Sequence, residues 1–165
     1  MSKGKLYLAH GYGFSEITYF SINNLVIPLI ERSGYEVICP WKILPEEYVR
    51  KIRSMPYSKR MLRLNRELDK KIADSDLEAI VDKDTRGIIA ILDGVPLDTG
   101  VASECASACD AGKKILGYRN DYRPIAESVS TPISLMVAKS VRDSGGKMIK
   151  TLRRMEYELK HGFFD

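Results

Sequence analysis

The sequence predicts an α/β protein built on a parallel sheet of four to five strands. Short β-rich runs alternate along the chain with longer segments of helical periodicity, the pattern of strands joined by right-handed crossovers. One run, Gly87–Leu92 (GIIAIL), is apolar throughout, as expected of a parallel strand with both faces covered. A glycine-containing turn at Gly11–Phe14 follows the first run and indicates a strand, a loop and a helix in succession.

The first half of the chain predicts two strands separated by a helical segment. The strands are Lys5–His10 and Tyr35–Cys39, both rich in residues that favour extended structure. Between them, residues 16–32 have an imperfect helical pattern that stops before Ser33-Gly34, a helix-ending signal. The apolar positions of this pattern are Ile17, Phe20, Leu25, Pro28 and Leu29.

The second half continues the alternation. Residues 45–83 carry helical periodicity with a break near Pro56, and Val101–Ala111 is a helix of almost only small residues, which can approach a sheet closely. Further strands are expected at Lys114–Tyr118 and Met148–Ile149, followed by a last helix over Thr151–His161. The buried stripe expected near the end of the long helical segment consists of Ile72, Leu77, Ile80 and Val81.

Length and composition are those of one soluble globular domain spanning residues 1–165. The chain is 44% hydrophobic and 29% charged, an ordinary composition for such domains. No apolar run approaches the roughly 18–20 residues of a membrane helix, and the first ten residues lack the layout of a signal peptide. We therefore expect a cytoplasmic protein with no membrane partner.

The cysteine and histidine content argues against disulfides and metal sites. Cys39, Cys105 and Cys109 are an odd number in a chain large enough to build its own core, so we expect reduced thiols. Two histidines without a CxxC or HExxH pattern make a protein-built zinc site improbable. We expect no metal and no cofactor.

Charge is unevenly distributed. Residues 42–71 hold ten Lys or Arg against four acids, a local charge of +6, whereas residues 72–110 hold nine acids against two basic residues, a local charge of −7. A basic stripe can bind nucleic acid or phosphate, but on a long amphipathic helix it is more often a solvated face. We favour the solvated face and expect no nucleic-acid partner.

Two loops are the candidate ligand sites. Ligands of open α/β sheets bind beyond the carboxyl ends of the strands, which selects residues 8–15 and 93–101. The glycines at 11 and 13 do not complete a GxGxxG motif because Glu16 holds the third position, and no Walker motif is present. A dinucleotide or a nucleoside triphosphate is therefore disfavoured.

The strongest local signal is Asp93-Gly94-x-x-x-Asp98-x-Gly100-x-x-x-Glu104. Asp98 or Thr99 can cap the helix that follows, and Glu104 is the one charged residue between Thr99 and Cys109. A surface helix usually carries more charge, so Glu104 is a candidate functional acid, and the helix N-terminus should favour its ionised form. A plain N-cap and one exposed acidic position are the structural alternatives.

With these residues the chain resembles the nucleoside 2-deoxyribosyltransferase family and the related 2′-deoxynucleoside 5′-phosphate N-hydrolases. The resemblance runs from Lys5-Leu6-Tyr7-Leu8 through Asp74–Ile80 and Asp98-x-Gly100-x-x-x-Glu104 to Lys114, with a weaker match at Pro132–Met136. It implies a flavodoxin-like, Rossmann-like three-layer sandwich. It also implies cleavage of the N-glycosidic bond of a 2′-deoxynucleoside.

The resemblance assigns roles to individual residues. Glu104 matches the family's nucleophile, Tyr7 the tyrosine that orients it, and Asp76 and Asp98 the acids near the base and sugar. A carboxylate can trap an oxocarbenium-like C1′ covalently, and the departing base needs a proton from a carboxyl group of raised pKa. Residues expected to contact substrate are Gly11, Phe14, Asp93, Gly100 and Ser134.

Two departures from the family pattern leave open whether a nucleobase or water accepts the deoxyribosyl group. The N-hydrolases have serine where this chain has Asp98, which favours a transferase that exchanges a free nucleobase. Serine at Ser134, where the transferases tend to have asparagine, resembles the phosphate-reading hydrolases. The resemblance further implies a homo-oligomer in which a neighbour supplies Ser134, and a non-catalytic nucleotide-binding module on the same fold is the alternative from another class.

Overall fold

The computed structural model describes residues 2–43, 54, 56, 66–123 and 133–165. Its centre is a sheet of five strands in the order β2-β1-β3-β4-β5, and every neighbouring pair is parallel. The predicted parallel sheet and flavodoxin-like topology are confirmed, including the short fifth strand. The strands are β1 (Lys5–Ala9), β2 (Glu36–Ile38), β3 (Thr85–Ile91), β4 (Lys114–Tyr118) and β5 (Lys147–Ile149).

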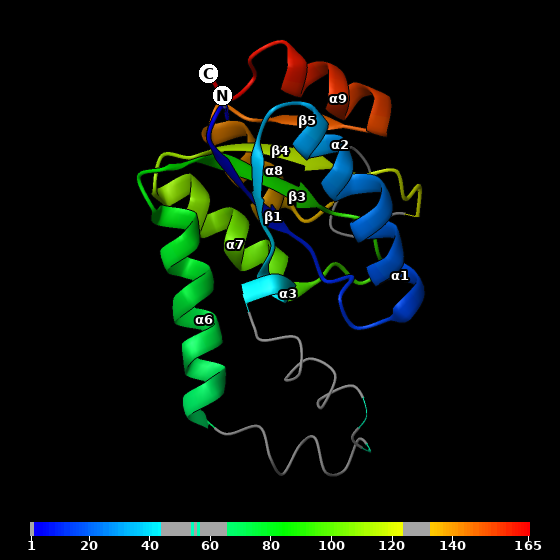
Figure 1. Ribbon diagram of the computed structural model, residues 1–165, viewed down its shortest axis with the longest axis vertical. Helices are drawn as coiled ribbons and strands as arrows, with labels where there is room; N and C mark the ends of the chain where they lie inside the picture. The colour runs from blue at the N-terminus through cyan, green and yellow to red at the C-terminus, as the bar shows by residue number, and fades with distance from the viewer. Residues whose placement is uncertain (1, 44–53, 55, 57–65, 124–132) are drawn as a thin grey trace.

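Helices cover both faces of the sheet, which gives the expected three layers (Figure 1). On one side lie α1 (Glu16–Ser21), the π-helical turn η1 (Ile22–Val26), α2 (Ile27–Arg32) and α9 (Leu152–Lys160). On the other side lie α6 (Arg66–Val81), α7 (Thr99–Asp110) and α8 (Leu135–Asp143). The short α3 (Pro40–Ile43) follows β2, and α8 is absent from the elements that the sequence predicts.

Alternation along the strands divides the core in two. Leu6 and Leu8 of β1 face the α2 and α9 side, whereas Tyr7 and Ala9 face the α7 side, and all four are fully buried. In β3, Ile88 and its neighbours are buried on both faces in the same way. The continuous apolar run of β3 therefore reflects a strand in the middle of a covered sheet.

The helix over residues 16–32 is formed, but its apolar pattern does not mark the buried face. Ile17, Phe20 and Leu25 are 78%, 66% and 55% exposed. The reason is η1, whose wider turn rotates the helix between its two α-helical parts. A regular 3.6-residue period read across this turn selects the wrong side. The buried residues of η1 and α2 are Ile22, Val26, Ile27, Leu29 and Ile30.

The stripe predicted on the end of the long helix is partly wrong. Ile80 of α6 is fully buried and Ile72 is half-buried, but Leu77 and Val81 are 44% and 53% exposed. Ile72, Asp76 and Ile80 share the buried side of α6, whereas Leu77 and Val81 each follow a residue of that side by one position and are therefore rotated about 100° away from it. The predicted helix over residues 45–65 lies outside the described residues, apart from Ser54 and Pro56.

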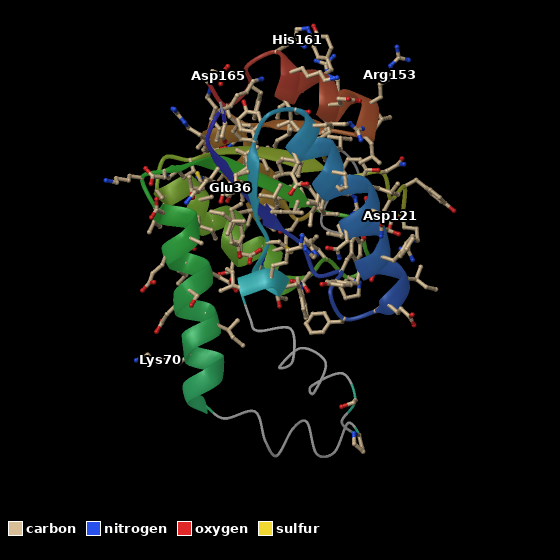
Figure 2. All side chains as sticks on the ribbon, viewed as in Figure 1. Glu36, Lys70, Asp121, Arg153, His161 and Asp165 are labelled. Atoms are coloured by element: carbon tan, nitrogen blue, oxygen red, sulfur yellow. The ribbon has the colours of Figure 1, made fainter. Side chains whose placement is uncertain are left out.

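The described side chains include two lysines of the basic segment and all three cysteines. Lys42 and Lys70 of the basic segment are exposed, and Lys70 lies on the part of α6 that extends away from the sheet (Figure 2). All three cysteines are free thiols. Within the described ranges, no helix has the length and apolar character needed to cross a membrane, and no cluster of potential metal ligands occurs.

Gly87 on the central strand β3 provides a test of the packing. A Cβ at this position would lie 2.7 Å from the carbonyl oxygen of Lys114 and 2.4 Å from the Phe164 ring. Since the Lys114 carbonyl belongs to the neighbouring strand, it cannot move aside cheaply. Gly87→Ala should lower the free energy of unfolding in urea by about 1–3 kcal/mol. Arg86→Ala, an exposed position on the same strand, should change it by less than about 0.5 kcal/mol.

Candidate active site

The site is located by the topology of the sheet. β1 pairs with β2 on one side and with β3 on the other, so the chain leaves these strands in different directions. The carboxyl ends of β1 and β3 are therefore the place where an open α/β sheet binds its ligand. Both loops that the sequence selects, residues 8–15 and 93–101, start at this place.

Tyr7 and Glu104 are in direct contact. The Tyr7 hydroxyl, from the middle of β1, donates a hydrogen bond of 2.7 Å to Oε1 of Glu104 in α7. Tyr7 is fully buried. The contact is possible because Cys105 and Ala108 keep the inward face of α7 small, so the helix can lie close to the sheet. Glu104 is partly buried and hydrogen-bonded, so the alternative of one exposed acidic position does not apply.

Glu104 has a strongly perturbed acidity. The pKa of its carboxyl is raised from 4.5 to about 7, chiefly by burial and also by the nearby carboxyls of Asp76 and Asp98, while the Tyr7 hydrogen bond opposes the rise. The helix N-terminus was expected to favour the ionised form, but the raised pKa means that burial outweighs any such effect. Glu104 lies in the second turn of α7, where the field of the helix end has largely decayed, and burial dominates.

Asp76 joins this pair from α6. Burial raises the pKa of Asp76, and a hydrogen bond with Tyr7 partly offsets the rise. The pKa of Tyr7 is itself raised, first by burial and then by the Glu104 and Asp76 carboxylates. The one proton of the Tyr7 hydroxyl is donated to Glu104, and the same hydroxyl is the group that favours the ionised form of Asp76. The three residues form one coupled group.

Asp98 caps the helix that carries Glu104, as predicted. Its Oδ1 accepts a 3.0 Å hydrogen bond from the Val101 amide. Gly11 lies directly against this carboxyl group, since a Cβ there would be 2.5 Å from Asp98 Oδ2, and a Cβ at Gly100 would be 3.0 Å from Oδ1. The structure therefore brings these predicted residues together. A side chain at either position would crowd Asp98, which explains why both residues are glycine.

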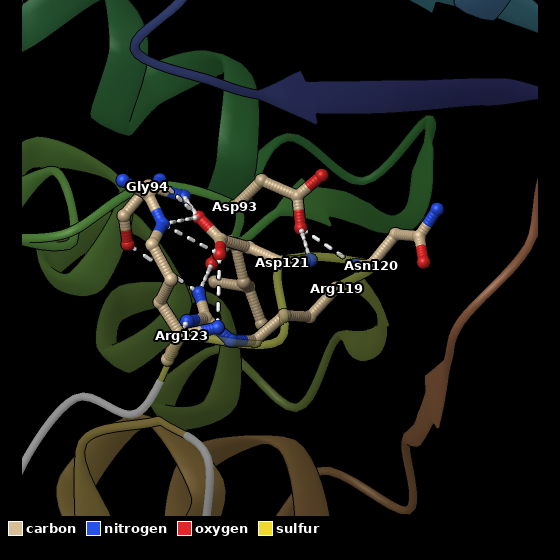
Figure 3. Close-up of polar contacts among 7 residues, drawn as sticks. Asp93, Gly94, Arg119, Asn120, Asp121 and Arg123 are labelled. Atoms are coloured by element: carbon tan, nitrogen blue, oxygen red, sulfur yellow. Dashed lines mark hydrogen bonds and ion pairs between the residues drawn. The ribbon is translucent and has the colours of Figure 1, made fainter.

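Asp93 holds the loops after β3 and β4 together and is not part of the group formed by Tyr7, Glu104 and Asp76. Its Oδ1 accepts hydrogen bonds from the amides of Asn120 and Asp121, at 2.6 and 2.8 Å. In return Asp121 Oδ2 accepts one from the Gly94 amide at 3.2 Å and is paired with Arg123 (Figure 3). These bonds tie the carboxyl ends of β3 and β4 together, and the sequence does not indicate them.

Arg119 is a residue that sequence reasoning missed. It is 4% exposed at the end of β4, and one of its terminal nitrogens donates to the carbonyls of Leu92 and Gly94 while the other donates to that of Arg123 (Figure 3). Its Nε has no partner among the described residues. The sequence feature that could have indicated its role is its position directly after the apolar strand Lys114–Tyr118.

His10 was also missed, although it ends the predicted first strand. It is 4% exposed, and burial lowers its pKa to about 4 against the opposing charge of Asp98. Nδ1 accepts from the Tyr12 amide at 3.2 Å, so the ring proton lies on Nε2, which faces Cys39 Sγ at 3.3 Å. His10 is therefore a neutral link between the ends of β1 and β2.

Phe14 and Ser134 make no contact with Glu104 among the interactions described above. Phe14 is 79% exposed and makes an edge contact with Trp41, their ring centroids being 4.6 Å apart. Ser134 occupies the N-cap position of α8, where its side chain makes no capping hydrogen bond. None of the polar contacts of Glu104 described above involves Ser134.

A buried carboxyl group of raised pKa, held by a tyrosine beside two further carboxyls, has the features of an enzyme site. Such a set can supply a nucleophile and a proton donor for cleaving a glycosidic bond. The comparison with protein families agrees, since the model of the family described as nucleoside 2-deoxyribosyltransferase matches residues 6–136. The chain belongs to this family of enzymes that cleave N-glycosidic bonds.

Several solved structures share the fold. The chain is 19% identical to a 2-deoxyribosyltransferase from Bacillus psychrosaccharolyticus, with a TM-score of 0.63 over 92% of this chain and 90% of that one. A 2-deoxyribosyltransferase from Leishmania mexicana is 18% identical, with a TM-score of 0.61 over 96% and 98%. The CMP N-glycosidase of Clostridium botulinum is 19% identical, with a TM-score of 0.55 over 98% and 99%. No curated protein matches the sequence.

The raised pKa of Glu104 has a consequence for stability. The folded protein retains a proton that the unfolded chain releases near pH 4.5, so stability falls as the pH rises from about 4.5 through about 7. Glu104→Gln should therefore be more stable than the wild type at about pH 8, by up to about 3 kcal/mol, with little difference at about pH 4. Thermal unfolding at both pH values tests this, with the exposed Asp110→Asn on the same helix as control. A variant without greater stability at the higher pH would contradict it.

Tyr7 and Asp76 should shift the pKa of Glu104 in opposite directions. Tyr7→Phe removes a donor to the ionised carboxylate and should raise the pKa above about 7, whereas Asp76→Asn removes a like charge and should lower it. Carbon-13 NMR titration of the Glu104 carboxyl measures both shifts directly. Shifts of the same sign in the two variants would show that the three groups are not coupled in this way.

Proposed function

We propose that this protein cleaves the N-glycosidic bond of 2′-deoxynucleosides and transfers the deoxyribosyl group to a second nucleobase through a covalent intermediate on Glu104. The observation that carries the proposal is the 2.7 Å hydrogen bond from the buried Tyr7 hydroxyl to Glu104 Oε1. It holds one carboxylate oxygen and leaves the other for the substrate. Family membership supports the bond that is cleaved.

The first half of the reaction follows from these groups. One oxygen of ionised Glu104 attacks C1′, and the electron pair of the C1′–N bond leaves with the base, which takes a proton from Asp76. A pKa of about 7 leaves a substantial fraction of Glu104 ionised near neutral pH. Formation of the ester removes a negative charge from a site where Asp76 and Asp98 disfavour it.

The second half is the reverse process with a new base. A nitrogen of the incoming base attacks C1′ from the face that the first base has left, the bond to Glu104 breaks, and the carboxylate is restored. The proton released by the new base returns to Asp76. Two displacements at C1′ retain the configuration of the sugar, as in retaining glycoside hydrolysis.

An uncharged nucleoside fits the described part of the site better than a 5′-monophosphate. Asp76, Asp98 and Glu104 gather there, and a phosphate would add charge of the same sign. The two arginines at the end of β4 are already engaged, Arg119 with backbone carbonyls and Arg123 with Asp121. This supports transfer between nucleosides as the first proposal.

The second candidate is a 2′-deoxynucleoside 5′-monophosphate N-hydrolase, and Ser134 is the observation in its favour. Ser134 is the N-cap residue of α8, and its side chain makes no capping hydrogen bond, so a phosphate at the start of this helix is the ligand that we propose for it. In either case we propose a homo-oligomer in which a neighbour contributes this part. Met136, two residues further on, is 68% exposed, as an interface residue would be in a separated chain.

Loss of the Glu104 carboxylate should abolish base release. Glu104→Gln should lower kcat by about 10³-fold or more, since the nucleophile is removed while the fold is kept. Asp110→Asn, an exposed acid on the same helix, is the matched control and should leave kcat unchanged. The assay is chromatography of deoxyadenosine and deoxyinosine with and without free cytosine or adenine. Unchanged turnover in Glu104→Gln would overturn the proposal.

The same assay separates the candidate functions. A new nucleoside formed only when a second base is present supports the transferase. Free base released chiefly from deoxyguanosine monophosphate supports the N-hydrolase and assigns Ser134 to the phosphate. Binding of a deoxynucleoside by calorimetry without any turnover would identify a non-catalytic binding module.

A further inference from the structure

Trp41 lies beside the site, although neither the motifs nor the proposed chemistry uses it. It is the one tryptophan of the sequence and belongs to the short α3 that follows β2. Its ring is half-buried against the core on the α2 side, and its indole nitrogen donates a 3.4 Å hydrogen bond to the carbonyl of His10. The side chain therefore reaches from the end of β2 to the end of β1.

The indole ring lies directly on Gly13. A Cβ at Gly13 would be 1.9 Å from two carbons of the ring, Cδ2 and Cε2, a distance that no side chain can occupy. The backbone of Gly13 is not in the left-handed region, so it would accept alanine. The need for glycine at this position comes from the Trp41 ring alone.

The loop from Gly11 to Phe14 is therefore held from two sides. At its start Gly11 packs against the carboxyl of Asp98, and at its end Gly13 and Phe14 pack against Trp41. The rings of Phe14 and Trp41 are nearly perpendicular, at 85°. This edge contact fixes the Phe14 ring while leaving it 79% exposed, and therefore free to pack on a flat ligand.

We propose that Trp41 is a positioning residue that holds the Gly11–Phe14 loop against Asp98, so that the Phe14 ring can pack on the base of the substrate. The identity of that ligand rests on the proposed function. Trp41 touches neither Glu104 nor Tyr7 in the described contacts, so it acts on substrate binding rather than on the bond-breaking step.

Kinetic constants test this role. Trp41→Ala should raise KM for deoxyadenosine by about tenfold or more and leave kcat within about threefold, because the Tyr7 and Glu104 pair is unchanged. Trp41→Phe, which keeps a ring over Gly13, should restore most of the lost affinity. Tyr157→Ala, at an exposed aromatic of α9, a helix that lies away from α3 (Figure 1), is the matched control and should behave as wild type.

Gly13→Ala tests the contact without touching Trp41 itself. It should raise KM as Trp41→Ala does, and the double variant should be no worse than Trp41→Ala, since one contact is lost in both. Gly13→Ala and Trp41→Phe also keep the test valid if Trp41→Ala fails to fold. Additive effects, or a KM within about twofold of wild type in Trp41→Ala and Gly13→Ala, would overturn the proposal.

Fluorescence separates this proposal from the proposed function. Trp41 is the one tryptophan, so its emission should change when deoxyadenosine binds, and the resulting Kd should rise about tenfold or more in Gly13→Ala. A wild type that binds without turnover, with Kd raised in Gly13→Ala, keeps the positioning role and overturns the enzyme. A wild type that neither binds nor turns over deoxyadenosine, deoxycytidine or deoxyguanosine monophosphate overturns both.

Discussion

The hydrogen bond between Tyr7 and Glu104 is the interaction on which the site depends. It requires a helix to lie close to a strand, and the small inward residues of α7 allow this. The same close packing removes water from Glu104 and raises its pKa to about 7. Burial therefore gives the carboxyl both its fixed position and its unusual acidity. The cost is a destabilised ionised form, a feature found often at functional sites.

Around this pair, side-chain contacts hold the loops at the carboxyl ends of the strands in place. Asp98 caps α7 and receives Gly11, Trp41 covers Gly13, and Asp93 ties the loop after β4 to the loop after β3. Each of these contacts involves backbone amides or glycine, so loop position is set by the main chain. A site that acts on one bond of a substrate needs such fixed loops, because small displacements reduce catalysis.

Most secondary structure followed from the sequence because its signals are local. The five strands, the helix of small residues and the cap at Asp98 are all found in the structure. Two failures concern which side of a helix is buried: η1 rotates the first helix and exposes Ile17, and the buried side of α6 includes Ile80 but not Leu77. Neither fault can be detected without knowing what each helix packs against.

The sequence by itself determined the parallel sheet, the two ligand loops and Glu104 as an isolated acid, since period, glycine position and charge spacing are local properties. Tyr7 and Asp76 were selected by resemblance to a family, and nothing local distinguishes them. The tertiary structure alone decided that both lie beside Glu104, that Arg119 and His10 are buried links, and that the pKa of Glu104 is raised rather than lowered. These properties depend on distances between segments far apart in the chain and on the water excluded between them, and a linear sequence encodes neither explicitly.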